Sequence, residues 1–287
     1  NSGSFLWFFL LLPKERTTSR ETAVKTLAEK GNLVMSNETN ETPVQGRKVG
    51  IARFFELLGR DLWPLYKSGI LCVLGFLPGT ALAVFGMMAG SALLTVVGGV
   101  VGGLVGGPFL SGMIDTVLRA LRDEPGYWWV TYRRAWKRNA KASLLPGAIC
   151  GLLLAMEIFT AFHIETGSVA VMVAIFVALI LLAGIAQYLY AQVALVDLPF
   201  SSLLKNSLML FLGYLPRSAL GILWQGLYWA AIALFWPLSG AVLILTSLWF
   251  PCSLSLLAIY PALNKSFDLE AKIKAMRDAQ LDSHDED

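Results

Sequence analysis

The chain has 287 residues and a formal net charge of +3, with 56% of its residues hydrophobic and only 15% charged. Soluble domains are about 25% charged, so this composition excludes an ordinary soluble globular protein. Three cysteines and two histidines, without metal-ligand spacing, predict neither a metal, nor a cofactor, nor a structural disulfide.

The first predicted part is a polar N-terminal extension and juxtamembrane segment, residues 1–62. Its apolar run Phe5–Leu12 is too short to cross a bilayer. The polar stretch that opens at Met35 is typical of a flexible bacterial N-terminus, so we expect Met35 to be the native start. The alternative is a genuine short hydrophobic tail on the membrane surface.

A membrane domain of residues 63–263 follows, and residues 264–287 are expected to form a charged cytoplasmic tail. Apolar runs of about 20 residues predict transmembrane helices, because lipid cannot satisfy exposed backbone groups. We therefore expect an all-α, polytopic membrane helix bundle with six transmembrane spans. They are expected at about Pro64–Phe85, Gly90–Ile114, Ser143–Phe162, Ser168–Val193, Pro216–Phe235 and Ser239–Tyr260.

The positions of Lys and Arg predict the orientation of these spans. The short turns around Met88, Glu165 and Pro237 contain no basic residue, whereas the segments on the other side are rich in them. Basic loops stay in the cytoplasm. The sequence therefore predicts an N-in/C-in topology, with both ends of the chain in the cytoplasm.

The second expected span contains paired glycines spaced four residues apart. Such rows form a groove along a helix face and let a neighbouring helix approach closely, so we interpret them as packing residues. The alternative is a flexible helix beside a substrate path. The glycines are Gly98, Gly99, Gly102, Gly103, Gly106 and Gly107.

Residues 127–141, between the second and third spans, combine aromatic and basic side chains. On a helix the aromatics gather on one face and the cations elsewhere, which predicts an interfacial amphipathic helix against anionic lipids of the inner leaflet. A topology anchor and a docking surface for a cytoplasmic partner both remain open, and nucleic acid is not expected. The lipid-facing or partner-docking candidates are Trp129, Tyr132, Arg133, Arg134, Trp136, Lys137 and Arg138.

Glu157 is the ionisable residue well inside an expected span, and such residues are functional candidates. Gln187 and Gln225 add polarity to the fourth and fifth spans. A substrate or proton path through these three residues is one interpretation, and a structural or water-facing role is the other. We expect Asp115 and Asp197, at the cytoplasmic span ends, to face water or the basic loop.

Catalytic motifs such as Walker A, GxSxG and HExxH do not occur in the sequence, so no enzyme activity is predicted. The leading hypothesis is a non-enzymatic membrane protein that assists transport. The alternative is a small-solute transporter or channel with Glu157 in its path. A membrane enzyme acting on lipid is the third hypothesis.

Several segments resemble one known family. They are Arg53–Gly59 (RFFELLG), Leu77-Pro78, Gly107-Pro108, Leu118–Tyr127 (LRALRDEPGY), Ala135–Asn139 (AWKRN), Val196–Phe200 (VDLPF) and Leu204–Ser207 (LKNS). Together they are similar to the YesL-like family of bacterial integral membrane proteins (domain of unknown function 624). The chain departs from the family pattern in the thirty or so residues between Leu77 and Gly107, which suggests an added membrane segment.

The resemblance implies a multi-pass protein of the bacterial cytoplasmic (plasma) membrane. It also implies a role as an accessory of carbohydrate uptake or utilisation, with other membrane subunits of a sugar-uptake system as partners. It implies no catalytic residue and no cofactor.

Overall fold

The computed structural model describes residues 50–124, 126–163 and 169–271. The chain divides into two units, Asn1–Lys48 and Val49–Asp287, and all described residues lie in the second. The predictions for Met35, for the N-terminal extension up to residue 49 and for most of the charged tail therefore fall outside the described residues.

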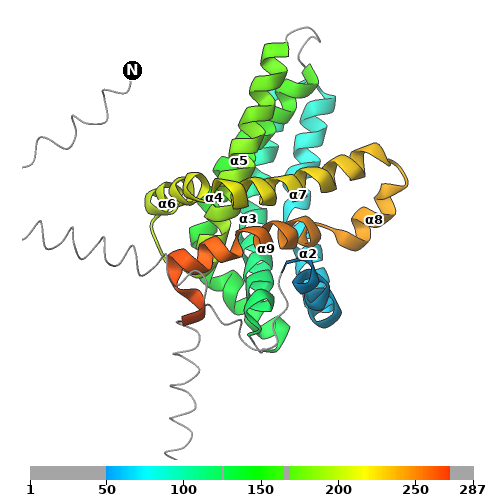
Figure 1. Cartoon of the computed structure of the whole chain (residues 1–287). Coiled ribbons are helices and arrows are strands. Elements are labelled where there is room, and N and C mark those ends of the chain that lie inside the picture. Colours follow the sequence, from blue (N-terminus) through cyan, green and yellow to red (C-terminus); the bar gives the residue numbers. More distant parts are fainter. Residues whose placement is uncertain (1–49, 125, 164–168, 272–287) are drawn as a thin grey trace, which may run out of the picture. The chain divides into compact units, whose positions relative to one another are not determined.

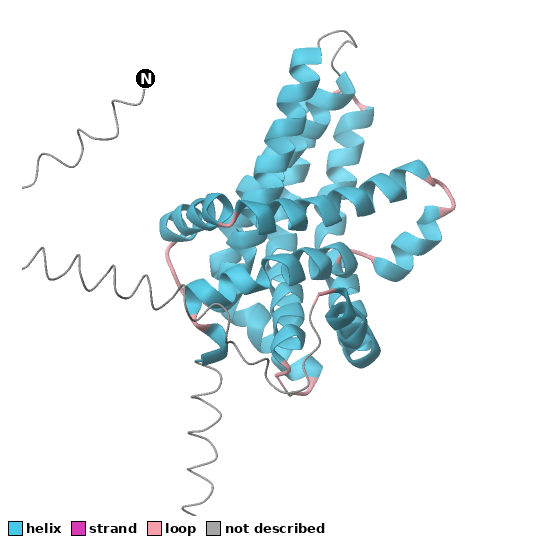
Figure 2. Cartoon of the chain, viewed as in Figure 1, coloured by secondary structure: helices cyan, strands magenta, loops and turns pink. Residues whose placement is uncertain are grey.

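The predicted all-α fold is confirmed, and the described part of the chain contains no strand (Figure 2). The helices are α2 (Ile51–Met88), α3 (Ala92–Arg122), α4 (Trp128–His163), α5 (Val169–Leu195), α6 (Phe200–Gly213), α7 (Leu215–Leu234), α8 (Ser239–Thr246) and α9 (Trp249–Phe267).

Four helices, α2 to α5, are long and apolar enough to cross a membrane, and the number rises to six if two bent helix pairs each count as one span. The pairs are α6–α7, bent by 97°, and α8–α9, bent by 63°. Figure 1 shows α7 and α9 running across the direction of α3 and α5. The expected fifth span, Pro216–Phe235, coincides with the helix α7, whereas the expected sixth span is divided between α8 and α9.

Local backbone chemistry explains both bends. Pro216 lies in the first turn of α7, where its ring and missing N–H prevent α6 from continuing as one helix. Between α8 and α9, Ser247 has φ 49° and ψ −151°, a conformation outside the helical region that ends the helix. The expected single helix Ser239–Tyr260 is therefore wrong, because Ser247 divides it in two.

One face of α3 packs against α2 through glycine. A Cβ atom on Gly98 would collide with the backbone of Ala83, and one on Gly106 would meet the ring of Phe76. A Cβ on Gly102 would lie 3.4 Å from the Cα of Gly79, an ordinary contact. This face tolerates contact with the neighbouring backbone because its side chains are absent.

A second face of α3 packs in the same way against α4. Cβ atoms on Gly99 and Gly103 would collide with the carbonyl groups of Gly151 and Gly147, and one on Gly107 would lie 2.8 Å from the carbonyl oxygen of Ser143. Both glycine rows of the second span thus lie in helix contacts, and α3 is the central helix of α2, α3 and α4.

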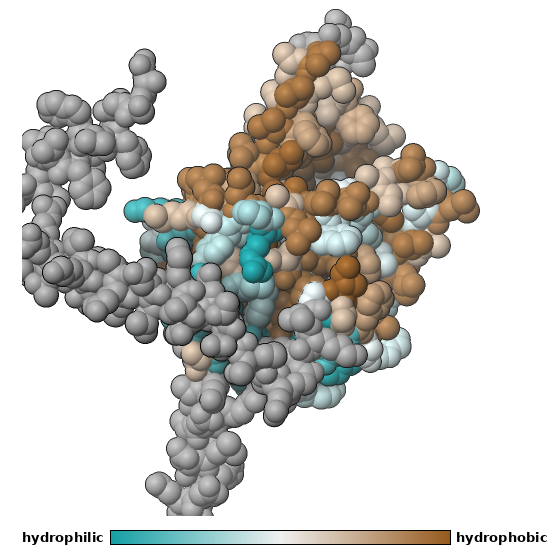
Figure 3. Space-filling model, in the orientation of Figure 1, coloured by the Kyte–Doolittle hydropathy of each residue, from teal (hydrophilic) through white to brown (hydrophobic). Residues whose placement is uncertain are grey.

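The outer surface is strongly apolar. In α5 the most hydrophobic stretch has a mean hydropathy of 3.1 and is only 6% buried, with Met172 and Phe176 each 65% exposed. Figure 3 shows hydrophobic residues over α5 and over the α7–α8 end. A monomeric soluble protein rarely exposes so many neighbouring large apolar side chains, so this surface is suited to contact with lipid.

Candidate functional site

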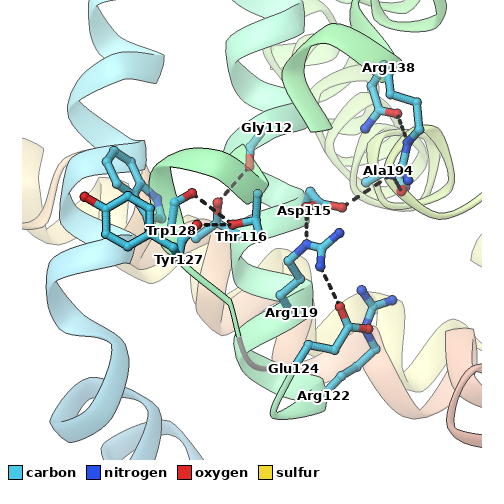
Figure 4. Close-up of polar contacts among 12 residues, drawn as sticks. Gly112, Asp115, Thr116, Arg119, Arg122, Glu124, Tyr127, Trp128, Arg138 and Ala194 are labelled. Carbon is cyan, nitrogen blue, oxygen red and sulfur yellow. Dashed lines mark hydrogen bonds and ion pairs between the residues drawn. The ribbon is translucent and has the colours of Figure 1, made fainter. Parts of the chain in front are cut away.

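Charged side chains gather where the start of α2, the end of α3 and the start of α4 meet, and we call this group the charged cluster. Its members pair almost entirely with one another, as Figure 4 shows for the part around Asp115. They are Arg53, Glu56, Arg60, Asp61, Asp115, Arg119, Arg122, Asp123, Glu124 and Arg138.

The end of α3 fixes one half of the charged cluster. Asp123 ends the helix in a left-handed conformation, with φ 58°, and leaves nearby carbonyl groups for other donors. Arg53, only 4% exposed, donates to the Leu121 carbonyl (3.0 Å) and to the Asp123 carboxylate (2.8 Å). The start of α2 is thereby attached to the end of α3.

Arg60 makes a second attachment of the same kind. It donates to the Ala120 carbonyl at 2.8 Å and pairs with Asp123 and with Asp61. The hydrogen bond to Asp61, with a smaller effect from Asp123, raises the pKa of the Arg60 guanidinium, although partial burial opposes that shift. Arg60 therefore stays charged at any physiological pH.

Asp115 organises the other half. It is 2% exposed and lies 2.7 Å from Arg119 and 3.5 Å from Arg138. Arg138 also donates to the Ala194 carbonyl, at 2.8 Å, near the end of α5. The Asp115 carboxylate thus joins α3 to α4, and its partner Arg138 extends the connection to α5. Of the two alternatives expected for Asp115, water or the basic loop, the structure supports the second, because Asp115 is buried and pairs with Arg138 of the 127–141 segment.

A kink in α2 opens a small cavity beside the cluster. Pro64 has no N–H to bond the carbonyl of residue 60, and Asp61 leaves the helical conformation, with φ −116° and ψ 16°. The resulting cavity has a volume of about 60 Å³. It is lined by Asp61, Pro64, Thr116, Arg119, Ala120, Glu124, Gly126, Trp128 and Thr131.

One aromatic residue, Trp128, lines the cavity and also lies under the Lys67 side chain. The Lys67 ammonium lies 5.4 Å from the Trp128 ring centre and 5.9 Å from that of Trp63, distances that allow cation–π attraction. The indole Nε1 of Trp128 is shielded from solvent and has no hydrogen-bond partner among the described residues. Trp63 and Tyr127 are 67% and 76% exposed, as is typical of side chains at a membrane–water interface.

The 127–141 segment is not a separate helix, because residues from Trp128 onward are the first turns of the continuous helix α4. Tyr132 is 3% exposed and packs on Gly112, so its assignment as lipid-facing is wrong. Trp136 is half-buried against Phe109, with ring centres 5.7 Å apart, while Trp129 is 46% exposed.

The basic residues of this segment fall into two groups. Arg138 forms hydrogen bonds within the protein to Asp115, Asn139 and Ala194. Its charge is therefore already engaged and is less available to bind a partner protein. Arg133, Arg134 and Lys137 are exposed and form no ion pair within the described part of the chain. We call these three residues the free cationic row.

The three residues proposed to line a path, Glu157, Gln187 and Gln225, are not hydrogen-bonded to one another. Glu157 is half-buried, and its Oε2 has no partner among the described residues. Gln187 is 8% exposed, accepts from Ser255 at 2.6 Å and donates to the Ser218 carbonyl at 3.4 Å. Gln225 is half-buried on α7. No hydrogen bond between described residues joins the three into one network.

A metal site has no support in the described ranges, where no group of three or more His, Cys, Asp or Glu residues converges. The sequence interpretation missed Arg53, Arg60, Asp61, Asp123 and Glu124. Both acidic and basic residues are visible in the sequence just before the first expected span and just after the second. Nothing in the sequence indicates which carboxylate pairs with which arginine.

Long apolar helices with an apolar outer surface define the chain as a multi-pass α-helical membrane protein. Comparison with protein-family models, with curated proteins and with solved structures gave no match to the chain. The membrane character therefore rests on the helices themselves, and the YesL-like resemblance stays a prediction.

Proposed function

We propose that the chain is a non-enzymatic accessory protein of carbohydrate uptake or utilisation in a bacterial plasma membrane. In this proposal six spans cross the membrane, the pairs α6–α7 and α8–α9 count as the last two, and both termini lie in the cytoplasm. The distribution of Lys and Arg supports the orientation. The family resemblance supports the carbohydrate connection.

The free cationic row is the observation that carries the proposed accessory role. The neighbouring charged cluster neutralises its own charges internally, whereas Arg133, Arg134 and Lys137 point their charges outward without a described partner. Exposed charges of one sign steer and orient a partner of opposite charge. An acidic surface on a cytoplasmic or membrane subunit is the partner that fits, with anionic lipid as the competing one.

Cysteine labelling tests the six-span topology. Leu238, in the α7–α8 turn, is 82% exposed, and Ser201, at the start of α6, is also exposed. In intact cells a membrane-impermeant maleimide is expected to label Leu238→Cys but not Ser201→Cys, and cell lysis should make Ser201→Cys reactive. Labelling of Ser201→Cys from outside would reverse the orientation. An unlabelled Leu238→Cys that reacts after lysis would mean that α7 and α8 re-enter the membrane without crossing it.

Neutralising the free cationic row tests the function. The variant Arg133→Gln/Arg134→Gln/Lys137→Gln leaves Arg138 and its bonds intact, and removes about 1 kcal/mol of attraction per charge near an acidic surface. The variant is expressed in a host strain from which the gene has been deleted, and its amount in the membrane is matched to that of the unsubstituted protein. We expect this strain to grow several-fold more slowly on a polysaccharide than the strain with the unsubstituted protein. Unchanged growth at normal abundance would contradict the accessory role.

A transporter is the second candidate, favoured by the shielded and unpartnered Oε2 of Glu157. Glu157→Gln keeps the shape of the side chain and removes its titration. Within the accessory proposal this variant should grow as the unsubstituted protein does. If it instead abolishes growth while the cationic-row variant is silent, the transporter replaces the accessory role.

A further inference from the structure

The first turns of α4 present exposed cations on one side of the helix. The free cationic row, Arg133, Arg134 and Lys137, is followed one turn later by Lys141, which is also exposed and forms no ion pair within the described ranges. With 3.6 residues per turn, these four positions fall within an arc of about 100° and along about 12 Å of the helix. They form one continuous surface of positive charge, which we call the cationic patch.

The chain carries an acidic segment that matches this patch. Residues 282–287, with the sequence DSHDED, contain four carboxylates and no Lys or Arg. A fully extended segment of this length spans about 20 Å, which is enough to lie along the whole cationic patch. The partner proposed for the free cationic row also presents an acidic surface, so the segment offers the same chemistry from within the chain.

The acidic segment can reach the cationic patch from the end of α9. The last described residue is Ala271, and residues 272–281 connect it to the segment. A connection of ten residues extends to about 35 Å. Helix α3 packs against both α4 and α9, and the axes of packed helices lie about 8–10 Å apart, which separates α4 from α9 by about 20 Å. In the proposed orientation the start of α4 and the end of α9 both face the cytoplasm, so the bilayer does not lie between them.

We propose that residues 282–287 bind the cationic patch of the same chain and compete there with its acidic partner. The connection to α9 holds the segment at an effective concentration of about millimolar, so surface ion pairs that are weak individually keep it on the patch until a partner displaces it. This regulation rests on the proposed accessory role, whereas the contact itself rests only on the proposed orientation. Anionic lipid is the other occupant that these charges attract.

Disulfide trapping in the full-length protein tests the contact. The variant Lys137→Cys/Asp285→Cys places one thiol in the patch and one in the acidic segment, and leaves the other charges of both in place. The control Lys205→Cys/Asp285→Cys uses an exposed lysine, the one basic residue of α6, on the same side of the proposed topology. In phosphatidylcholine nanodiscs at low salt, we expect oxidation to join the first pair about tenfold faster than the second, the combined effect of several weak ion pairs.

Mass spectrometry of proteolytic peptides measures each disulfide. The three single-cysteine variants correct for disulfides formed with the native cysteines, which are Cys72, Cys150 and Cys252.

Two further measurements show whether charge produces the contact. Adding Arg133→Gln/Arg134→Gln to the Lys137→Cys/Asp285→Cys protein should lower its trapping rate to that of the control pair. Salt at about 1 M, where the Debye length is about 3 Å, should do the same. The two glutamines replace exposed side chains, and such surface substitutions change stability little.

Three trapping results would overturn the contact. Equal rates for the two pairs at low salt would show that the acidic segment has no preference for the patch. A preference that persists at about 1 M salt would show that charge does not produce it. Loss of the preference when phosphatidylglycerol is added to the nanodiscs would assign the patch to anionic lipid.

Growth of the host tests the competition separately. Replacing the four carboxylates of residues 282–287 by their amides should raise the growth rate on the polysaccharide, because the partner then meets an unoccupied patch. An unchanged or lower rate would contradict the competition. Trapping is measured without a partner, so its failure leaves the accessory role standing. If trapping succeeds and neutralising the free cationic row does not slow growth, the contact stands and the accessory role falls.

Discussion

Replacing Gly103 by alanine is expected to destabilise the protein by about 1–3 kcal/mol or more, the cost of forcing an additional carbon into a packed interior. The added Cβ would collide with the carbonyl group of Gly147 on α4, and a backbone group cannot move aside as a side chain can. The two helices would have to separate along their whole contact. The measurement is the midpoint of thermal or SDS-induced unfolding of the purified protein.

The neighbouring residue provides the matched control. A Cβ on Gly102 would lie 3.4 Å from Gly79, within ordinary contact distance. Alanine is also a better helix former than glycine by up to about 1 kcal/mol. Gly102→Ala should therefore be neutral or slightly stabilising. Similar unfolding midpoints for both variants would show that α3 and α4 do not meet at Gly103.

Replacing Asp115 by alanine is expected to cost about 3 kcal/mol of unfolding free energy. Breaking a buried ion pair by removing one partner typically costs about 3–5 kcal/mol. The Asp115 side chain is 3% exposed, but those of Arg119 and Arg138 are 27% and 45% exposed, so water can partly solvate them once they lose the carboxylate. We therefore expect the lower end of that range.

Asp197→Ala is the control for Asp115→Ala, because Asp197 is an exposed carboxylate at the end of α5. Removing it should change the unfolding free energy by less than about 0.5 kcal/mol. The Asp115→Asn variant should fall between the two, since the amide keeps one acceptor for Arg119. An Asp115→Ala protein as stable as the unsubstituted one would mean that the three helices are held together by apolar packing alone.

Much of the fold could be predicted from the sequence. Long apolar runs predict helices because only a helix satisfies its own backbone in lipid, and the helices α2 to α5 lie where those runs lie. Prediction failed where a single residue overrides hydropathy. Ser247 breaks the apolar run that averages as the sixth span, since a hydropathy window is insensitive to one residue with a positive φ, whereas the expected fifth span, which begins at Pro216, coincides with α7.

The candidate site was less predictable. The amphipathic pattern of residues 127–141 correctly separates aromatic from basic side chains, but it cannot distinguish lipid from a neighbouring helix as the cover of the aromatic face. Tyr132 is buried because Gly112 on α3 leaves room for its ring. Similarly, Arg138 and Arg134 look equivalent in sequence. Only Arg138 finds partners within the protein, the Asp115 carboxylate and the Ala194 carbonyl at the end of α5, although its side chain stays partly exposed.

The two glycine faces of α3 also bear on how the protein is made. Of these three helices, α2 is synthesised first, α3 second and α4 third, and α3 has backbone contacts with both of the others. Until α4 arrives, the row around Gly99 and Gly103 can be filled only by lipid chains, which fit a narrow groove poorly. Protein can therefore cover the second glycine face of α3 only after α4 has been synthesised.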